Sequence, residues 1–298
     1  MKNTLQINLD YTQKSRQAYQ SFGLLVLVYA PVLMDLVSDW WNDPNYSHGF
    51  LVPVVSGYLL WKKRGKLATS VGESSRLGLP LLALALALFV VGSAGAEYFT
   101  VRVSFVVALA GLTLYHFGTS FLRRIWFELG FLLFMIPLPY VIYYSLTFPM
   151  QLFATKVSIK ALSLIGVPAV QQGNIIHLSG ISLEVAEACS GIRSMISLLA
   201  LGALFSYFSQ RGPIKRSVLF LSTIPIAVFT NSARVFITAV LAFTIEAEVT
   251  EEPLHGLMGL SVFVMAFALM LIFNALLGKV SSQVSSQASS HKKTGPDR

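Results

Sequence analysis

The chain is organised around the stretch Leu183-Glu184-Val185-Ala186-Glu187-Ala188-Cys189-Ser190-Gly191-Ile192-Arg193-Ser194, which contains its only cysteine. A polar, strand-like segment, residues 171–184, precedes Cys189, and a mainly apolar run, residues 192–208, follows it. The small pair Ser190-Gly191 marks the start of an apolar helix, so we expect Cys189 at a helix N-terminus, where the dipole favours a thiolate. A lone cysteine in an apolar protein is most often a small buried hydrophobe. Its neighbours in the fold decide between that role and a reactive one.

Composition indicates a membrane protein. Hydrophobic residues make up 54% of the 298 residues and charged residues 12%, with a mean hydropathy of +0.66. These values are typical of an integral membrane protein and not of a soluble domain. A single cysteine excludes an internal disulfide. The net charge is +8, but the basic residues form short clusters between apolar runs, as topology signals do, so we expect a lipid bilayer and no nucleic-acid partner.

The apolar runs predict an all-α integral membrane protein with about eight transmembrane helices, at residues 22–38, 48–61, 78–96, 99–117, 125–146, 191–209, 217–243 and 255–278. The second run is short and the fourth contains Arg102. We expect one polytopic membrane domain, residues 22–278, between a cytoplasmic N-terminal segment, 1–21, and a disordered, Ser/Gln-rich cytoplasmic tail, 279–298.

The charges predict an orientation. With both termini in the cytoplasm, most of the 22 Lys and Arg residues fall in cytoplasmic segments, and most of the 14 acidic residues lie on or near the outer face. The basic loop 62–76 and the pair Arg123-Arg124 are assigned to this topology signal alone. The basic residues outside the pattern are Arg102, Lys156, Lys160, Arg193 and Arg234.

Two motifs in the first half leave alternatives open. The run Tyr46-Ser47-His48-Gly49-Phe50-Leu51-Val52-Pro53 follows two tryptophans, so it is either an interfacial anchor or a functional loop. His48 enters the second span, where an idle imidazole is expensive, and Tyr46 is adjacent; both are candidate supporting or substrate-binding residues. Ile136-Pro137-Leu138-Pro139 interrupts the fifth run, either as a kink or as the wall of a lined cleft.

Two elements are expected outside the membrane, before the cysteine. Residues 147–166 mix apolar and basic side chains, which fits a helix along the outer interface, with a helical re-entrant segment as the alternative. Residues 171–185 alternate around a Ser179-Gly180 turn, which predicts a small extracytoplasmic β-hairpin.

Three residues converge on the outer leaflet by topology alone. Cys189 begins the sixth span, Arg234 lies about 12 Å deep in the outer half of the seventh, and His255 begins the eighth. A cysteine nucleophile needs a base such as histidine, and an arginine can stabilise an oxyanion or hold a carbonyl or carboxylate. Asn231 lies on the same helix face as Arg234 and could orient it, and Glu187 could tune His255 or Arg193. Arg234 in a structural ion pair with an outer glutamate is the alternative.

Other kinds of site find little support. One cysteine and scattered histidines lack metal-ligand spacing, so no metal or other cofactor is expected. There is also no glycine-rich phosphate loop. A small-solute transporter remains open, because an intramembrane arginine and broken helices occur in transporters too, but no pair of corresponding broken segments is present.

The motifs together resemble the exosortase/archaeosortase family of multi-spanning membrane cysteine transpeptidases, over most of the chain from Trp40 to Phe263. The matching stretches are Tyr46 to Pro53, Ile136 to Pro139, Glu187 to Ser194, Asn231 to Val235, and His255 with Gly259.

The resemblance implies roles and a setting. Cys189 would be the nucleophile, His255 the base and general acid, and Arg234 the group that binds the carbonyl or the transition state. The substrates would be exported proteins with a C-terminal sorting tail of the PEP-CTERM type, cleaved at the periplasmic face of the bacterial inner membrane, in a setting of exopolysaccharide and biofilm production. The cleavage motif, the acceptor and the oligomeric state stay open, and a non-catalytic component of polysaccharide export is a further alternative.

Overall fold

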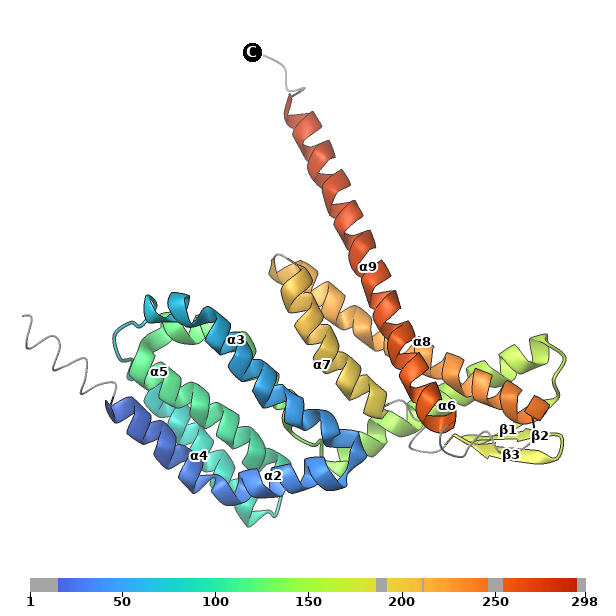
Figure 1. The fold of residues 1–298 in the computed structure, drawn as a ribbon, viewed down its shortest axis with the longest axis horizontal. Coiled ribbons are helices and arrows are strands. Elements are labelled where there is room, and N and C mark those ends of the chain that lie inside the picture. The colour runs from blue at the N-terminus through green and yellow to red at the C-terminus, as the bar shows by residue number, and fades with distance from the viewer. Residues whose placement is uncertain (1–15, 186–191, 211, 246–253, 294–298) are drawn as a thin grey trace, which may run out of the picture. The chain divides into compact units, whose positions relative to one another are not determined.

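The computed structural model describes residues 16–185, 192–210, 212–245 and 254–293, and for 192–194, 245, 254–258 and 280–293 only the course of the backbone. The described residues are mostly helical (Figure 1). Contacts divide the chain into two compact units, Met1–Pro139 and Tyr140–Arg298, and each is described by itself.

In the described part of the first unit, the regular elements are all helices. A helix over Arg16–Val28 meets α2 (Ala30–Asn42) at an angle of 60°. Pro31 explains the bend, because its ring nitrogen cannot donate to the carbonyl four residues earlier. The later elements are η1 (Pro44–Phe50), α3 (Leu51–Ala68), α4 (Gly78–Ala94), α5 (Tyr98–Phe131) and η2 (Leu132–Met135).

α5 is two helices joined at a kink. Gly118 has φ 81° and ψ 177°, a conformation that L side chains rarely adopt. A Cβ at this position would also overlap the carbonyl oxygen of Glu73. The first half of α5, up to this kink, coincides with the predicted span 99–117. It packs along α4, and the side chain of Glu97 caps it by accepting from the backbone N–H groups of Phe99 and Thr100, at 3.2 and 2.7 Å.

The predicted fifth span, residues 125–146, is not one continuous helix, and its interruption lies at the proline pair, as the sequence indicates. Its first part belongs to the second half of α5 and to η2, and the chain then runs without helix from Ile136 to Pro139. Pro137 and Pro139 are the reason, because proline lacks an N–H and forces the preceding residue into an extended conformation. Ile136 accordingly has φ −92° and ψ 120°.

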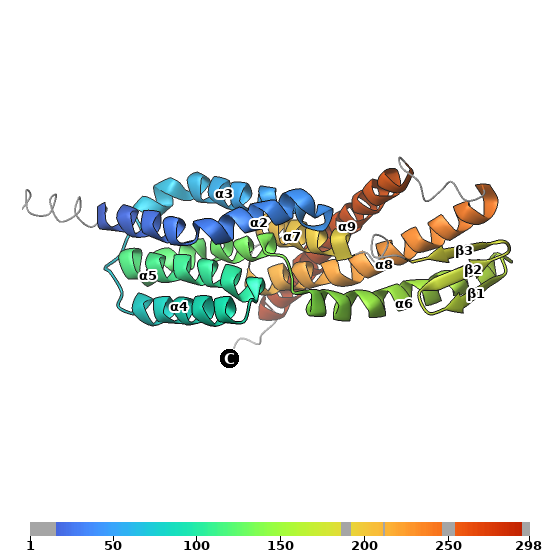
Figure 2. The same ribbon diagram turned by 90° about the horizontal axis from the view of Figure 1, so that it is seen from below.

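The second unit consists of α6 (Tyr140–Leu164), three short strands, and the helices α7 (Ile192–Ser209), α8 (Pro213–Ile245) and α9 (Leu254–Lys293). α8 is central, because α6, α7 and α9 all contact it (Figure 2). The segment 147–166, which the sequence predicts as a separate interfacial helix, forms the later part of α6 up to its end at Leu164. The helix begins earlier and tolerates Pro149 in its interior.

The expected β-hairpin is present as part of a three-stranded antiparallel sheet in the order β1 (Ala169–Gln172), β2 (Ile175–Leu178) and β3 (Ile181–Glu184). The Ser179-Gly180 turn joins β2 to β3 as predicted, and Gly180 has φ 83°. A second tight turn at Gly173 and Asn174 adds β1, which the sequence analysis did not anticipate.

The count of eight spans is not confirmed. Within the described residues, three helices are long and apolar enough to cross a membrane, Tyr98–Met135, Pro213–Thr244 and Gly259–Lys279, and a fourth if the bent pair at Tyr29 is one span. Shorter apolar helices lie at Gly78–Ala94 and Met195–Ser209. The tail expected to be disordered from Lys279 continues as helix to Lys293, since it contains neither proline nor glycine before Thr294.

Candidate functional site

The site predicted from Cys189, Arg234 and His255 belongs to the second unit, where Arg234 lies on α8, His255 lies in the first turn of α9, and Cys189 precedes α7 in the sequence. Cys189 and Glu187 fall outside the described residues. For Arg193 in α7 and His255 in α9 the structure gives the course of the helix but not the side chain. Arg234 and Asn231 are both described, on α8.

Packing between α7 and α8 sets their register. A Cβ on Gly202 of α7 would overlap Thr223 of α8, so the two helices touch closely at this pair. Further out, Leu198 packs with Ala227. The two helices run in opposite directions. Arg234 is eleven residues after Thr223 on α8, so it lies at the height of the residue eleven positions before Gly202 on α7. That step reaches the N-terminus of α7, which begins at Ile192.

Packing between α7 and α9 sets a second register. The Phe205 and Phe267 rings lie 5.7 Å apart, Gln210 Nε2 donates to Asn274 Oδ1 at 2.6 Å, and Leu198 clusters with Ala266. These partners are 62, 64 and 68 residues apart in the sequence, and the helices run in the same direction. Adding these separations to Ile192, the first residue of α7, gives residues 254–260, so the start of α7 lies beside the first turns of α9. The N-termini of α7 and α9 are therefore level with Arg234.

The sheet anchors to α8 the residue that comes just before the cysteine segment, a name used here for residues 186–191. Val185, four residues before Cys189, is buried in one core cluster with Val235, the residue after Arg234. Asn174 holds Val185 in place, since the Val185 N–H donates to the Asn174 carbonyl at 2.9 Å and Asn174 Nδ2 donates to the Val185 carbonyl at 3.4 Å. The described residues on both sides of Cys189 thus pack against the part of α8 that contains Arg234.

Around Arg234, α8 is polar and buried. Arg234 is 8% exposed and Asn231 2%. Among the residues that the structure describes, Asn231 Oδ1 has no hydrogen-bond partner, so there the amide oxygen forms no bond that would orient Arg234. Nearby on α6, Ser158 Oγ donates to the Ser232 carbonyl at 3.4 Å. A buried amide oxygen without a donor costs about 1–3 kcal/mol.

The Tyr46–Pro53 motif has a different place, in the first unit. Tyr46 and His48 lie in η1, and His48 Nε2 lies 3.2 Å from the Phe134 carbonyl oxygen. Because a carbonyl only accepts, the ring must donate from Nε2. Trp40 Nε1 likewise donates to the Met135 carbonyl at 2.8 Å. The His48 and Trp40 rings thus satisfy carbonyls that the Pro137 break leaves without helical partners.

These bonds connect two motifs that the sequence analysis treated separately. Gly49 belongs to the same arrangement, because a Cβ there would overlap the Trp40 indole. The contacts favour the anchoring interpretation of this loop over a direct part in chemistry.

Sequence reasoning missed two ion pairs. Arg102, an exception in the predicted fourth span, lies 2.7 Å from Asp39. Lys63, assigned to topology alone, lies 2.6 Å from the fully buried Glu128 and also donates to the Arg124 carbonyl at 2.9 Å. That assignment is therefore incomplete. A glutamate in an apolar run was the available signal, since a buried carboxylate needs a cationic partner.

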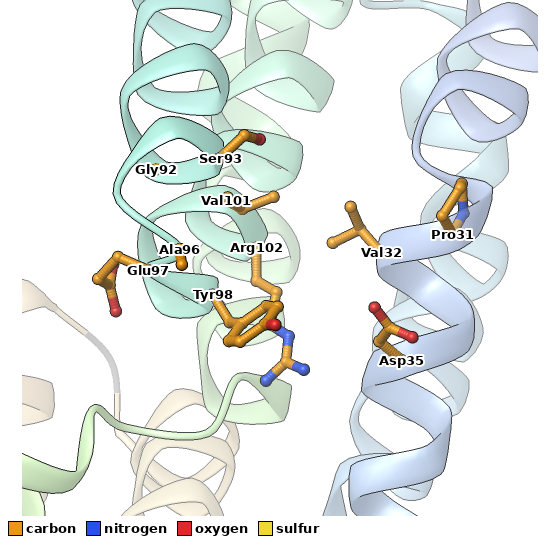
Figure 3. Close-up of a pocket in the computed structure, with 10 residues that line it drawn as sticks. All are labelled: Pro31, Val32, Asp35, Gly92, Ser93, Ala96, Glu97, Tyr98, Val101 and Arg102. Carbon is orange, nitrogen blue, oxygen red and sulfur yellow. The ribbon is translucent and has the colours of Figure 1, made fainter.

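A cavity of about 260 Å³ opens beside Arg102, between α2 and the turn from α4 to α5 (Figure 3). Asp35 faces it from α2, opposite the Arg102 guanidinium. Arg102 Nε is buried and has no hydrogen-bond partner among the described residues. The cavity belongs to the first unit and contains none of the three residues on which the chemistry was predicted.

No metal centre is found among the described residues, where no three His, Cys, Asp or Glu side chains are grouped suitably for one. The described part of the chain likewise offers no glycine-rich loop for a phosphate cofactor.

Comparison with known proteins identifies the family. The family model described as "Transmembrane exosortase (Exosortase_EpsH)" matches residues 40–272. Neither the search of curated proteins nor that of solved structures gives a significant match. The matched range covers more than half of the chain and includes the Tyr46 motif, the proline pair, the cysteine segment, Arg234 and His255. The chain therefore belongs to the transmembrane exosortase family.

Proposed function

We propose that this exosortase is a membrane-embedded cysteine protease or transpeptidase that cleaves the C-terminal sorting tails of exported proteins. The observation that carries the proposal is the common level of Arg234 and the N-termini of α7 and α9. Cys189 lies three residues before α7, and His255 is the second residue of α9. We infer that a nucleophile, a base and a cation meet at this level of the helix bundle.

Each residue has a chemical role in this proposal. Cys189 attacks as the thiolate, and His255 is the base that takes the thiol proton and later returns it. Arg234 is held in a buried position, so its guanidinium meets the developing oxyanion, or the substrate carbonyl, in a medium of low dielectric. Glu187 and Arg193 are supporting residues near the cysteine. Asn231 provides a buried acceptor for a substrate N–H.

The reaction balances without a cofactor. The Cys189 sulfur forms a bond to the scissile carbonyl carbon, and the C–N bond of the resulting tetrahedral intermediate breaks. The proton held by His255 goes to the leaving amine, which remains on the tail. An amine acceptor then resolves the thioacyl-enzyme by transpeptidation, or water resolves it by hydrolysis.

The substrate class follows from the family and from the setting in a bilayer. We propose tails of the PEP-CTERM type, with a short motif, a hydrophobic span and a basic end. Such a tail lies in the membrane and presents its motif at the outer face of the bacterial inner membrane. We place both termini in the cytoplasm and link the activity to exopolysaccharide and biofilm production. A site at the outer membrane boundary suits a substrate that enters sideways from the lipid.

A tagged reporter with a PEP-type tail tests the proposal. It is co-expressed with the wild type, Cys189→Ala or Cys189→Ser, and its size is followed on a gel. Tail loss with the wild type alone, together with a hydroxylamine-sensitive adduct on Cys189, is expected. Equal processing in all three strains would remove Cys189 as nucleophile and favour a non-catalytic export component. Solute flux that depends on Arg234 but not on Cys189 would favour a transporter.

A further inference from the structure

β3 presents an open hydrogen-bonding edge directly before the cysteine segment. In the β2–β3 ladder, Ile176 faces Leu183 and Leu178 faces Ile181. The bond from the Val185 N–H to the Asn174 carbonyl marks the pair at 174 and 185 as hydrogen-bonded. Hydrogen-bonded and non-hydrogen-bonded pairs alternate in an antiparallel ladder, so Ser182 and Glu184 point their N–H and C=O groups away from β2.

That edge has no partner strand within the described residues, because the sheet order ends at β3. The side chains do not close it either. Ile181 and Leu183 point to the inner face, where Leu183 packs against the cluster of Val185 and Val235. On the outer face, Ser182 Oγ hydrogen-bonds His177 Nδ1 at 2.7 Å, and His177 Nε2 hydrogen-bonds Gln172 Oε1 at 3.0 Å, both across the sheet. No described strand or side chain named here pairs with the backbone edge of β3 itself.

The edge also leads to the proposed nucleophile. Glu184 is the last residue of β3 and Cys189 follows five residues later, a reach of at most about 17 Å for an extended chain. β3 contacts α8, and Leu183 of β3 packs in the core cluster that contains Val235, next to Arg234. An extended peptide laid along β3 is therefore guided toward the cysteine segment.

We propose that the β3 edge, Ser182 to Glu184, binds the substrate's sorting motif as an added strand. This inference rests on the proposed function and names how that site holds its substrate. Strand addition gives affinity through the backbone, so it accepts different side chains in a short motif while fixing the scissile bond in register. The occupant is the stretch just before the scissile bond. It runs parallel to β3, because both chains approach the membrane boundary and Cys189 from outside.

The geometry gives a rule for every second residue. In a parallel pairing, one motif residue donates its N–H to the Ser182 carbonyl and accepts from the Glu184 N–H through its own carbonyl. The residues on either side of it direct their N–H groups away from β3. Proline is therefore excluded at one position of the motif and tolerated at the positions flanking it.

A proline in the enzyme tests the edge with a matched control. Glu184→Pro removes the outward N–H but no bond to β2, whereas Glu184→Ala keeps that N–H and loses the same carboxylate. We expect Glu184→Pro to process the tail reporter about tenfold more slowly than Glu184→Ala, the effect of one lost hydrogen bond, at equal membrane abundance and melting temperature. Equal rates for the two variants would overturn the proposal.

A proline scan of the substrate tests the same point with the wild-type enzyme, so enzyme folding cannot intervene. Proline is placed at each of four consecutive residues before the scissile bond of the reporter. We expect cleavage to be lost and retained at alternate positions. If the Glu184→Pro enzyme does not accumulate in the membrane, the result of this substrate scan decides between the outcomes. Uniform tolerance, or a block at every position, would overturn strand addition. Failure of the proposed function itself is distinct, because the unmodified reporter would then remain uncleaved.

Discussion

Among single residues, Arg234 is the one whose chemistry is tested most cleanly. Its side chain is 8% exposed and comes from the middle of a long apolar helix. Arg234→Lys keeps the positive charge but loses the planar fork that binds a carbonyl or an oxyanion at two points. We expect reporter processing to fall about 10²-fold, as for the loss of an oxyanion donor.

The lysine variant also separates catalysis from structure. If Arg234 only forms a structural ion pair, lysine preserves the pair, and processing should stay within a few-fold of the wild type. Membrane abundance and the melting temperature in detergent should remain near the wild-type values in either case. Rates of Arg234→Lys comparable to the wild type would therefore contradict the catalytic assignment.

Gly49 gives a prediction about stability. Gly49→Ala places a Cβ against the Trp40 indole and breaks the bond from Trp40 Nε1 to the Met135 carbonyl. We expect a loss of about 1–3 kcal/mol in the free energy of unfolding. Gly57→Ala in α3 is the control, because no atom lies within 4 Å of its Cβ, and it should be neutral or slightly stabilising. Thermal unfolding in detergent compares the two, and equal melting temperatures would contradict the packing described.

The sequence alone points to single functional or structural residues only where burying the side chain costs much free energy. An arginine within an apolar run demands an explanation wherever it occurs, so Arg234 and Arg102 were noticed. Their surroundings were not predictable, because the partners are distant in the sequence. Lys63 meets Glu128, and Trp40 meets the Met135 carbonyl, across 65 and 95 residues of chain. The lack of a described donor for Asn231 Oδ1 also depends on how the helices pack, so it was not predictable from the sequence.

At the scale of elements, the contact between α7 and α8 supports the site. Gly202→Ala would overlap Thr223 and push the two helices apart, so we expect both processing and melting temperature to fall. Thr223 Oγ1 is buried and has no hydrogen-bond partner in the described part of the chain, so Thr223→Ala alone should be nearly neutral. The double variant Gly202→Ala/Thr223→Ala should recover most of the loss. A double variant as impaired as Gly202→Ala would contradict the register on which the site is built.

The cap of α5 gives a prediction about pH. Burial raises the pKa of Glu97, but hydrogen bonds from Thr100 and Phe99, with the charge of Arg102, outweigh it and hold the pKa below its usual value. A lowered carboxyl pKa contributes stability that is present above the ordinary value and lost as pH falls through the folded-state value.

We therefore expect Glu97→Ala to cost about 0.5–2 kcal/mol at pH 7. The gap between this variant and the wild type should narrow as the pH falls below about 4.5. Melting curves across pH 3–7 measure the gap. A gap that stays constant over this range would mean that the carboxylate does not cap the helix.

Patterns of several residues predicted which helices and strands form better than they predicted where these elements begin and end. The apolar runs at 78–96, 99–117, 191–209 and 217–243 coincide with α4, the first half of α5, α7 and α8. Turn chemistry located β2 and β3. The run at 125–146 is interrupted at Pro137 and Pro139, as these residues predict, because a helical backbone does not continue across them. α6 begins before the predicted interfacial helix because Pro149 is tolerated inside it.

For the whole molecule, the sequence established class and family but not the span count. Composition indicated a membrane protein, and the family match agrees. The count of eight relied on apolar length alone. In the structure the short second run is divided between η1 and α3, which carries Lys62, Lys63, Arg64 and Lys66, and the fifth run is broken. Apolar length cannot separate a span from a helix that ends or bends within it.

The proposed chemistry requires that Cys189, Arg234 and His255 meet at one level of the bundle of α7, α8 and α9. The chain has a single cysteine, so a second one can be placed anywhere without background. His255→Cys and, about two turns deeper on α9, Phe263→Cys are each treated in membranes with a short bifunctional thiol reagent. Mass spectrometry then detects the internal link to Cys189. We predict a link for His255→Cys and none for Phe263→Cys, whereas the reverse result, or no link in either, would contradict the account.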